Sequence, residues 1–458
     1  MVSFSSLDIV IIVFFFVSLL LIGYLSGSKK KITGKEEFLL NNRNVGLLLF
    51  ILTNVSTWYG GILGVGEFTY RSGILSWVTQ GLPYYIFAIA FAFMFAPKIR
   101  SASLFTIPDK LEQTYGRTVG LITAVLIFIL VSPAPYILMI GSLIKLIFGI
   151  DLIWSLILST LLSSAYLIKG GYRSDLYTDV LQFFVMFIGF MIIVFVSFTE
   201  VGGIGYLKTT LPETHFSISG GAFPLYLIVW FLIALWTFAD PGFHQRCYAA
   251  KSGSVAKWGI IISIFFWILF DFLTTTTGLF ARAALPNLEN PVFAFPLYAE
   301  KILGNGLKGI FYSALFATII STSNSFLFIS GTTFGKDLVS KFYSSSNQTE
   351  KKLILYVKLG IVISGIIAVI LSYTIQSVID LWYLMGSFCL PGLILLIFGS
   401  YYDRLRVSSY YAILEIIIGS STSIAWHFTR DQLANSIFTI IEPMIVGLTF
   451  AVIIHLWG

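Results

Sequence analysis

Residues 308–336 read KGIFYSALFATIISTSNSFLFISGTTFGK. The segment is long and apolar enough to span a bilayer, yet hydroxyl and amide side chains gather in its middle, among them Ser321, Thr322, Asn324 and Ser325. Hydroxyl oxygens and free backbone carbonyls suit a hard cation such as sodium, because they replace its hydration shell without adding a fixed charge. An alternative is that these small residues let two membrane helices pack closely and hydrogen-bond to each other.

Composition indicates the class of protein around this segment. The chain has 458 residues, of which 57% are hydrophobic and only 11% are charged, and its mean hydropathy is +0.90. These values exclude a soluble domain and predict a polytopic integral membrane protein in a lipid bilayer. The two cysteines, Cys247 and Cys389, are far apart in sequence and predict neither a disulfide nor a metal site.

Apolar runs of membrane-spanning length recur along the whole chain. They predict an all-α fold of about thirteen transmembrane helices within a single transmembrane domain, residues 1–458. The predicted spans are 8–27, 45–69, 77–97, 118–146, 151–169, 177–199, 223–239, 257–281, 309–333, 353–374, 377–400, 408–427 and 435–457.

Basic residues crowd into alternate loops of this arrangement, which predicts that those loops are cytoplasmic. The opposite loops, such as 200–222 and 284–307, carry few positive charges. We therefore expect a plasma-membrane protein with its N-terminus outside and its C-terminus inside. The net charge of +6 reflects this asymmetry and requires no nucleic-acid partner. The basic residues are Lys29, Lys30, Lys31, Lys35, Arg43, Lys98, Arg100, Lys110, Arg117, Arg246, Lys251, Lys257, Lys336, Lys341, Lys351, Lys352, Arg404 and Arg406.

Two spans contain residues that disfavour a continuous helix. Within 45–69, a polar stretch is followed by four glycines, and the span 223–239 ends at Asp240-Pro241-Gly242. Interruptions at corresponding positions of two halves are typical of inverted-repeat transporters, whose unwound backbone binds ions and solute. Tight helix packing is the alternative explanation for the glycines.

Several local patterns together resemble the sodium/solute symporter family, whose members include proline permease, a pantothenate permease and a sodium/galactose transporter. The patterns are EEFLLNNRNVG, GVGEFTYRSG, FTIPDKLEQTYG, GGYRSDLYTDVLQ, DPGFHQRCYAAK and ALFATIISTSNS. The resemblance implies a LeuT-type core of five plus five helices in inverted repeat, here residues 45–400. One extra helix, 8–27, would precede this core, and two extra helices within 408–457 would follow it.

The same resemblance implies a sodium site between the span 309–333 and the interrupted span 45–69. The hydroxyl groups of Ser321 and Thr322 would bind the ion, together with backbone carbonyls. Counting along the family pattern from two directions leaves two alternatives for the carbonyls of the interrupted span. The implied carbonyl positions are Thr318 together with Asn54 and Thr57, or, in the alternative register, with Ser56 and Tyr59.

Further polar and aromatic residues are candidates for solute binding or coupling. Asp179 resembles an acidic residue on the path by which sodium leaves, and Ser325 resembles a solute-facing position. Asp271 lies deep in an apolar span, so it is paired, protonated or functional. Since no basic residue is placed in the central cavity, we expect a neutral or zwitterionic solute. Gln80, Tyr136 and Trp236 are the candidate cavity walls.

These observations predict a sodium-coupled secondary transporter that imports a small organic solute by alternating access, with sodium co-transported. Proton coupling through Asp271 or Asp179 is one alternative. A transporter-like solute sensor without transport is another. An enzyme is not expected, because no nucleophile, paired carboxylates or metal-ligand set is evident.

Overall fold

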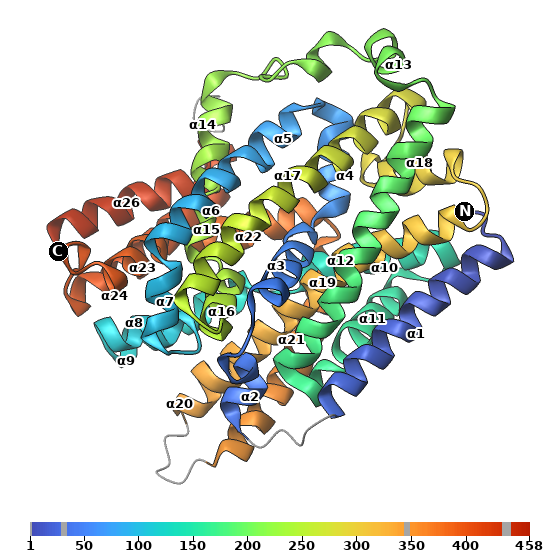
Figure 1. Cartoon of the computed structure of the whole chain (residues 1–458). Coiled ribbons are helices and arrows are strands. Elements are labelled where there is room, and N and C mark those ends of the chain that lie inside the picture. The colour runs from blue at the N-terminus through green and yellow to red at the C-terminus, as the bar shows by residue number, and fades with distance from the viewer. Residues whose placement is uncertain (1, 29–33, 343–348, 433–440) are drawn as a thin grey trace.

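The chain folds into a helical membrane protein, seen here in a computed structural model that describes residues 2–28, 34–342, 349–432 and 441–458. Within these ranges the regular structure is helical, apart from one isolated bridge between Val45 and Ala250. Most long helices run side by side along one common direction (Figure 1).

The longer helices coincide with the apolar runs of the sequence. They are α1 (Ser6–Ser28), α3 (Leu47–Ser56), α4 (Ile62–Ser72), α6 (Leu82–Met94), α9 (Arg117–Leu130), α10 (Ala134–Phe148), α11 (Leu152–Ser164), α12 (Leu167–Glu200), α14 (Pro224–Ile233), α17 (Gly253–Ala284), α19 (Leu307–Thr332), α21 (Glu350–Ile375), α22 (Val378–Cys389), α24 (Ser409–Thr429) and α26 (Pro443–Trp457).

Shorter helices connect or extend them. These are α2 (Lys35–Leu40), α5 (Leu75–Gln80), α7 (Ala96–Ala102), α8 (Ile107–Tyr115), α13 (Gly203–Thr210), α15 (Trp236–Ala239), α16 (Pro241–Ala249), α18 (Ala294–Ile302), α20 (Ser340–Phe342) and α23 (Ile394–Tyr401), with single turns η1 (Asn41–Arg43), η2 (Thr57–Tyr59), η3 (Glu213–Phe216), η4 (Pro291–Phe293), η6 (Leu390–Gly392), η7 (Asp403–Leu405) and η8 (Arg430–Gln432), and the π-helical segment η5 (Thr333–Val339).

The described residues contain eight helices long and apolar enough to cross a membrane, or up to ten if two bent pairs are each one span. The bent pairs are the predicted spans 45–69 and 377–400. The three remaining predicted spans coincide with α11, α24 and α26, of which α11 and α26 have only 13 and 15 residues. The beginning of the span 435–457 lies outside the described residues. The polytopic all-helical fold is confirmed, while the count of thirteen spans stays a prediction.

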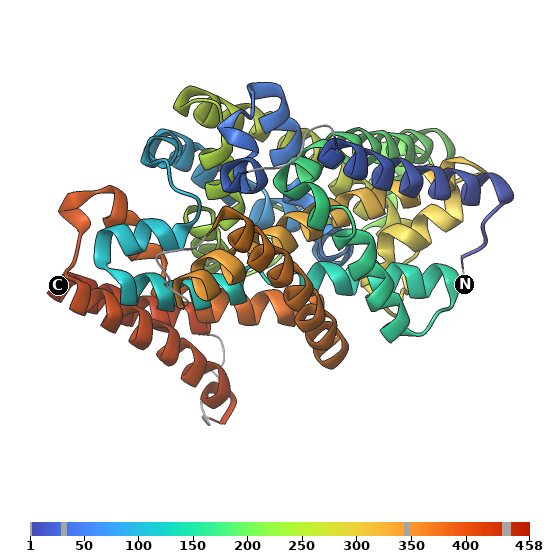
Figure 2. The ribbon, with the colours of Figure 1, turned by 90° about the horizontal axis from the view of Figure 1, so that it is seen from below.

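Helix α19, which contains the opening sequence, lies at the centre of the molecule. It packs among α1, α10, α12 and α21, and 94% of its most apolar window is buried, against 28% for α1. Figure 2 shows the helices around it from below, with the two ends of the chain at opposite ends of the molecule. Because α19 is enclosed by protein, its polar side chains are shielded from lipid.

One end of the molecule gathers basic residues from loops that are far apart in sequence. We call it the basic end and define it by Arg43, Lys110, Lys336 and Lys341. Arg43 donates to the backbone carbonyls of Ser103 (3.0 Å), Leu104 (3.0 Å) and Tyr248 (3.2 Å). Arg43 therefore ties the start of α3 to the loop before α8 and to α16.

A second tie at the basic end joins α8 to η5. Lys336 contacts Asp109 at 2.5 Å and Asp337 at 2.9 Å, and Lys341 contacts Glu112. Burial works to raise the pKa of Asp109, but the ammonium groups of Lys336 and Lys341 outweigh it and leave the pKa below its usual value. The acidic and basic side chains of this cluster therefore form ion pairs with each other.

Candidate functional site

The interrupted span bends where it reaches α19. Helix α3 ends at Ser56, a single 3₁₀ turn follows, and α4 begins at Ile62, with a bend of 57° between the two halves. Gly60 permits the close approach, because a Cβ atom there would lie 2.3 Å from the Cβ of Thr322. The turn at the predicted break therefore packs directly against α19.

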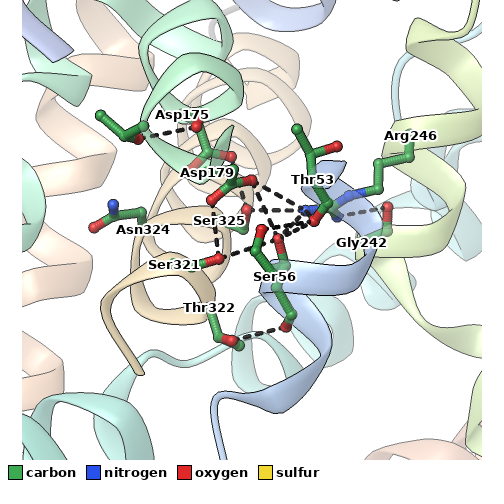
Figure 3. A network of polar contacts seen from close by, with 12 residues as sticks. Thr53, Ser56, Asp175, Asp179, Gly242, Arg246, Ser321, Thr322, Asn324 and Ser325 are labelled. Atoms are coloured by element: carbon green, nitrogen blue, oxygen red, sulfur yellow. Dashed lines mark hydrogen bonds and ion pairs between the residues drawn. The ribbon is translucent and has the colours of Figure 1, made fainter. Parts of the chain in front are cut away.

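At this contact the hydroxyl stripe of α19 meets the end of α3. The Thr322 hydroxyl donates to the backbone carbonyl of Thr57 at 2.7 Å. The Ser321 hydroxyl donates to Asp179 on α12 at 2.9 Å, and the Thr57 hydroxyl donates to the other oxygen of the same carboxylate at 3.2 Å. All four side chains are buried. Three helices thus bring neutral oxygen atoms and one carboxylate together (Figure 3).

A buried arginine completes this network. Arg246 of α16 is 3% exposed and reaches the Thr57 hydroxyl at 2.5 Å, the Ser325 hydroxyl at 3.3 Å and Asp179 at 3.9 Å. Ser325 in turn donates to Asp175 at 2.7 Å. The network therefore contains two carboxylates, Asp175 and Asp179, and one guanidinium group.

The balance of charge depends on whether both carboxylates are ionised. Buried charges are costly unless they are paired and hydrogen-bonded, and with both carboxylates ionised the single guanidinium group would leave one negative charge in excess. That excess would lie next to the hydroxyl groups of Ser321 and Thr322 and the carbonyl of Thr57. Such a place is suited to one monovalent cation held mainly by neutral oxygen ligands.

A cavity of about 1350 Å³ adjoins the same contact. Its lining includes Thr57 and Thr322 at the break, and also Phe223, Arg430 and Glu442, which lie just before α14, in η8 and just before α26. The expected wall residues Gln80, Tyr136 and Trp236 and the buried Asp271 all line it. The polar network and the cavity thus meet at the break in the second span.

Other predicted residues take different positions. Ser325, expected to face the solute, is buried and bonded to Asp175, and does not line the cavity. Thr318 turns its hydroxyl back to the Ala314 carbonyl at 2.6 Å. In the alternative register, the Ser56 hydroxyl bonds within its own helix, to the Thr53 carbonyl. Asn54 lies 4% exposed one turn before Thr57.

Tyr59, the other residue of the alternative register, packs away from the network. Its hydroxyl donates to the backbone carbonyl of Trp267 at 2.7 Å, and its ring lies against Phe270. Both contacts are with α17. Tyr59 therefore links the break to α17, although it also lines the cavity.

Three residues of the site were not recognised in the sequence as site residues. Arg246 was counted as a cytoplasmic-loop residue, and this was wrong: α16 continues inward from the break at Asp240 and buries it. Asp175 lies four residues before Asp179 on α12, a spacing that places both on one helix face and could have indicated a pair. Asp240 was noted only as part of a break, yet it lines the cavity.

Comparison with known proteins places this geometry among transporters. The sequence model of the sodium:solute symporter family matches residues 38–419. The chain is 27% identical over 415 residues to a high-affinity choline transporter of Caenorhabditis elegans, covering 83% of this chain and 71% of that protein. It is 24% identical to the osmoregulated proline transporter OpuE of Bacillus subtilis, covering 96% and 93%. A sodium/glucose cotransporter of Vibrio parahaemolyticus is 27% identical over 61% of this chain and 58% of its own length.

Solved structures show the same fold. A Na⁺-coupled sialic acid symporter in a substrate-bound, outward-open state superposes with a TM-score of 0.83 at 18% identity, covering 99% of this chain and 97% of that one. The nucleobase-cation symporter Mhp1 superposes with a TM-score of 0.60 at 12% identity, covering 92% and 94%. The LeuT-type architecture expected from the sequence is thereby confirmed.

Proposed function

The chain belongs to the sodium:solute symporter family, and we propose that its sodium ion binds where the break after α3 meets α19. The protein is a sodium-coupled solute symporter, an integral membrane transporter and not an enzyme. What remains to be assigned is the set of atoms that bind the ion, the route of its release and the kind of solute.

The proposed ligands are the hydroxyl groups of Ser321 and Thr322 and the backbone carbonyls of Thr318, Asn54 and Thr57. The Thr322 hydroxyl already lies 2.7 Å from the Thr57 carbonyl, so a single ion between the two helices can reach both. A helix end frees the carbonyls of its last turn, which include that of Asn54. This contact favours the register of Asn54 and Thr57 over that of Ser56 and Tyr59.

The observation that carries the proposal is this hydroxyl–carbonyl contact beside an excess negative charge. Sodium would neutralise the excess, and it would also bind the two half-helices to α19. An ion that bridges α3 and α19 favours the conformation in which these helices touch. Its binding therefore promotes the state that can bind the solute.

Asp179 is the proposed first step of sodium release. It bonds Ser321 and Thr57 on the side of the network that also contains Arg246, whose helix α16 leads to the basic end. An ion leaving the hydroxyl pair would meet this carboxylate next. Asp175 and Ser325 lie beside it on the same route.

The proposed solute site is the cavity next to the sodium site. The similar proteins transport choline, proline and glucose, which are small organic solutes. Gln80, Tyr136 and Trp236 would contact such a molecule, and we propose a neutral or zwitterionic one. Transport would proceed by alternating access, through rocking of the half-helices within a five-plus-five core of residues 45–400.

We also propose that the basic end faces the cytoplasm. The structure gathers basic residues from separate loops at that end, which is the arrangement expected of cytoplasmic loops in a plasma membrane. The N-terminal residues contact α18 at the other end, and the C-terminal Gly458 lies beside Tyr411 and Val407, close to η7. The N-terminus would then be outside and the C-terminus inside.

The test is sodium-specific stabilisation of the purified protein. We expect sodium to raise the melting temperature more than an equal concentration of potassium, since a ligand that binds only the folded state at a hundredfold its Kd contributes about 2.7 kcal/mol. Ser321→Ala and Thr322→Ala should each remove most of that sodium-specific rise.

Ser330→Ala is the matched control. Ser330 lies on the same helix, is 1% exposed and donates to Ser364 at 2.9 Å, so its loss should lower stability without changing the sodium effect. Equal protection by sodium and potassium would contradict the proposed site. A rise on acidification in place of the sodium effect would indicate proton coupling.

A further inference from the structure

The unpaired charges of the solute cavity are all negative. Four of the six charged residues that line it form pairs, Arg71 with Glu67 at 3.0 Å and Arg430 with Glu442 at 3.9 Å. The other two are Asp240 and Asp271. Within the described part of the chain, no lysine or arginine forms an ion pair with either of them. Neither cavity carboxylate is thus ion-paired to a protein cation in the described structure, although Arg246 lies near enough to Asp240 to act on it electrostatically.

Asp240 has one carboxylate oxygen committed to the protein. It caps α16, where its Oδ1 accepts from the backbone N–H of Phe243 at 2.8 Å. The Trp236 side chain also hydrogen-bonds this carboxylate, and the residue is half-buried in the cavity wall. Capping explains why an acidic residue or asparagine stands here, but it does not require a full charge facing the cavity.

Asp271 contributes a second carboxylate from α17. It is 9% exposed and accepts from the Tyr85 hydroxyl, which in turn accepts from the indole N–H of Trp77 at 3.2 Å. Its hydrogen bonds come from neutral groups, so they do not cancel its charge. Closure of the cavity around an uncharged solute would leave both carboxylates without a counter-ion and without water, which is costly.

Aromatic side chains line a large part of the remaining wall of the cavity. Trp58 and Tyr84 lie with ring centroids 5.3 Å apart, and Tyr136 and Trp382 with centroids 6.1 Å apart. Trp236 also lines the space. Aromatic faces attract ammonium groups through their quadrupole, and this attraction strengthens when water is excluded. The aromatic rings and the carboxylates of the cavity therefore both favour a ligand with a positively charged nitrogen.

We propose that the transported solute carries a positively charged nitrogen and that Asp240 is its counter-ion, with the ammonium group seated against the aromatic wall. The ligand class comprises organic cations and zwitterions that share such a nitrogen, and it excludes sugars and simple anions. This inference depends on the proposed function, because it takes the cavity beside the sodium site to be the solute site. It retains the zwitterions of the earlier expectation, replaces the neutral solutes and adds organic cations.

The experiment compares pairs of probes that differ in the nitrogen charge. Melting temperatures are measured in sodium with choline and its carbon isostere 3,3-dimethylbutan-1-ol, and with proline and cyclopentanecarboxylic acid. We expect protection by choline or proline and none by the isostere of the one that protects. Protection by an isostere equal to that of its nitrogen partner, or no protection by either nitrogen compound, would overturn the proposal.

Variants of Asp240 test whether this residue is responsible for the protection by the nitrogen compound. Asp240→Asn retains an N-cap side chain but removes the charge, and we expect half-maximal protection to need about tenfold more of the nitrogen compound, or more. Asp240→Glu should restore part of the affinity. Asp403→Asn is the control, because this exposed carboxylate pairs with Arg406 and does not line the cavity, and it should leave the affinity unchanged. An unaltered affinity in Asp240→Asn would refute the role of this residue.

The sodium response separates this inference from the proposed function. Asp240→Asn should retain the sodium-specific rise in melting temperature, which also shows that the variant is folded. If wild type showed no sodium-specific rise, the sodium site would be refuted. Protection by choline or proline, measured in potassium as well, would still decide whether the cavity selects a charged nitrogen.

Discussion

Single side chains at the site combine structural and electrostatic roles. Arg246 bonds Thr57 and Ser325 and lies near Asp179, so it both joins three helices and offsets part of the negative charge. The guanidinium group lies within hydrogen-bonding distance of the end of α3. The electrostatic energy of a sodium ion bound there therefore depends on the position of this group.

Arg246→Gln tests this balance. Removing one partner of a buried pair leaves an uncompensated charge, so we expect a loss of about 3–5 kcal/mol in sodium-free buffer. Because the cluster would then be more negative, sodium should recover part of the loss, and the sodium-specific rise in melting temperature should exceed that of wild type. A thermal-unfolding series in sodium and potassium measures both effects.

Arg406→Gln serves as the control for this change. Arg406 is 44% exposed and pairs with Asp403, which is 87% exposed, and such surface pairs contribute about 0–1 kcal/mol. The Arg406→Gln variant should therefore lose little stability and show the wild-type sodium response. An Arg246→Gln protein with wild-type stability and sodium response would contradict the charge balance described here.

At the scale of elements, the site depends on how closely the break approaches α19. Backbone of the turn between α3 and α4 lies against Thr322, with no room for a side chain at Gly60. Glycine also lowers the helix propensity of this turn. The same residue thus favours the break and admits the neighbouring helix, which places the Thr57 carbonyl at the hydroxyl pair.

Gly60→Ala should push the turn between α3 and α4 away from α19. The added methyl group would meet Thr322 at 2.3 Å, and overpacking of this kind costs about 1–3 kcal/mol. We expect a lower melting temperature and loss of most of the sodium-specific rise, because the ligand atoms no longer converge. Gly46→Ala, at the N-cap of α3 with nothing within 4 Å of the added Cβ, should preserve the sodium effect. A sodium response in Gly60→Ala equal to wild type would refute this account.

At the scale of the whole molecule, the two ends differ. Arg43 and the Lys336–Asp109 contact close the basic end, whereas the cavity extends from the break toward residues such as Phe223 at the other end. We therefore expect the proposed solute site to be reached from only one side of the membrane in this conformation. Figure 1 shows α13 and α14 at the end toward which the cavity extends.

Sidedness can be measured by cysteine labelling in intact cells. Phe223 is 84% exposed at the cavity end and Leu405 is 47% exposed at the basic end, while the native Cys247 and Cys389 are both 0% exposed and should react little. A membrane-impermeant maleimide should label Phe223→Cys from outside and label Leu405→Cys only after permeabilisation. The reverse pattern would invert the proposed orientation.

Much of the architecture could be predicted from local sequence. Apolar runs indicate membrane helices because backbone groups in lipid must bond within their own segment. The break in the second span and the polar stripe on α19 were likewise visible, since glycines and hydroxyl residues stand out in such runs. Ser321 and Thr322 lie against Thr57 in the structure, which is one of the two registers that the family resemblance implied.

Tertiary structure alone decided the electrostatics of the site. Arg246 appeared to be one more basic loop residue until α16 turned it inward, and Ser325 appeared to face the solute until it met Asp175. Asp240 gains its role from the cavity that α4, α6 and α22 complete around it. Composition and periodicity determine which segments enter the membrane, but the charge balance between distant segments depends on which helix faces pack together, and only the folded chain specifies that packing.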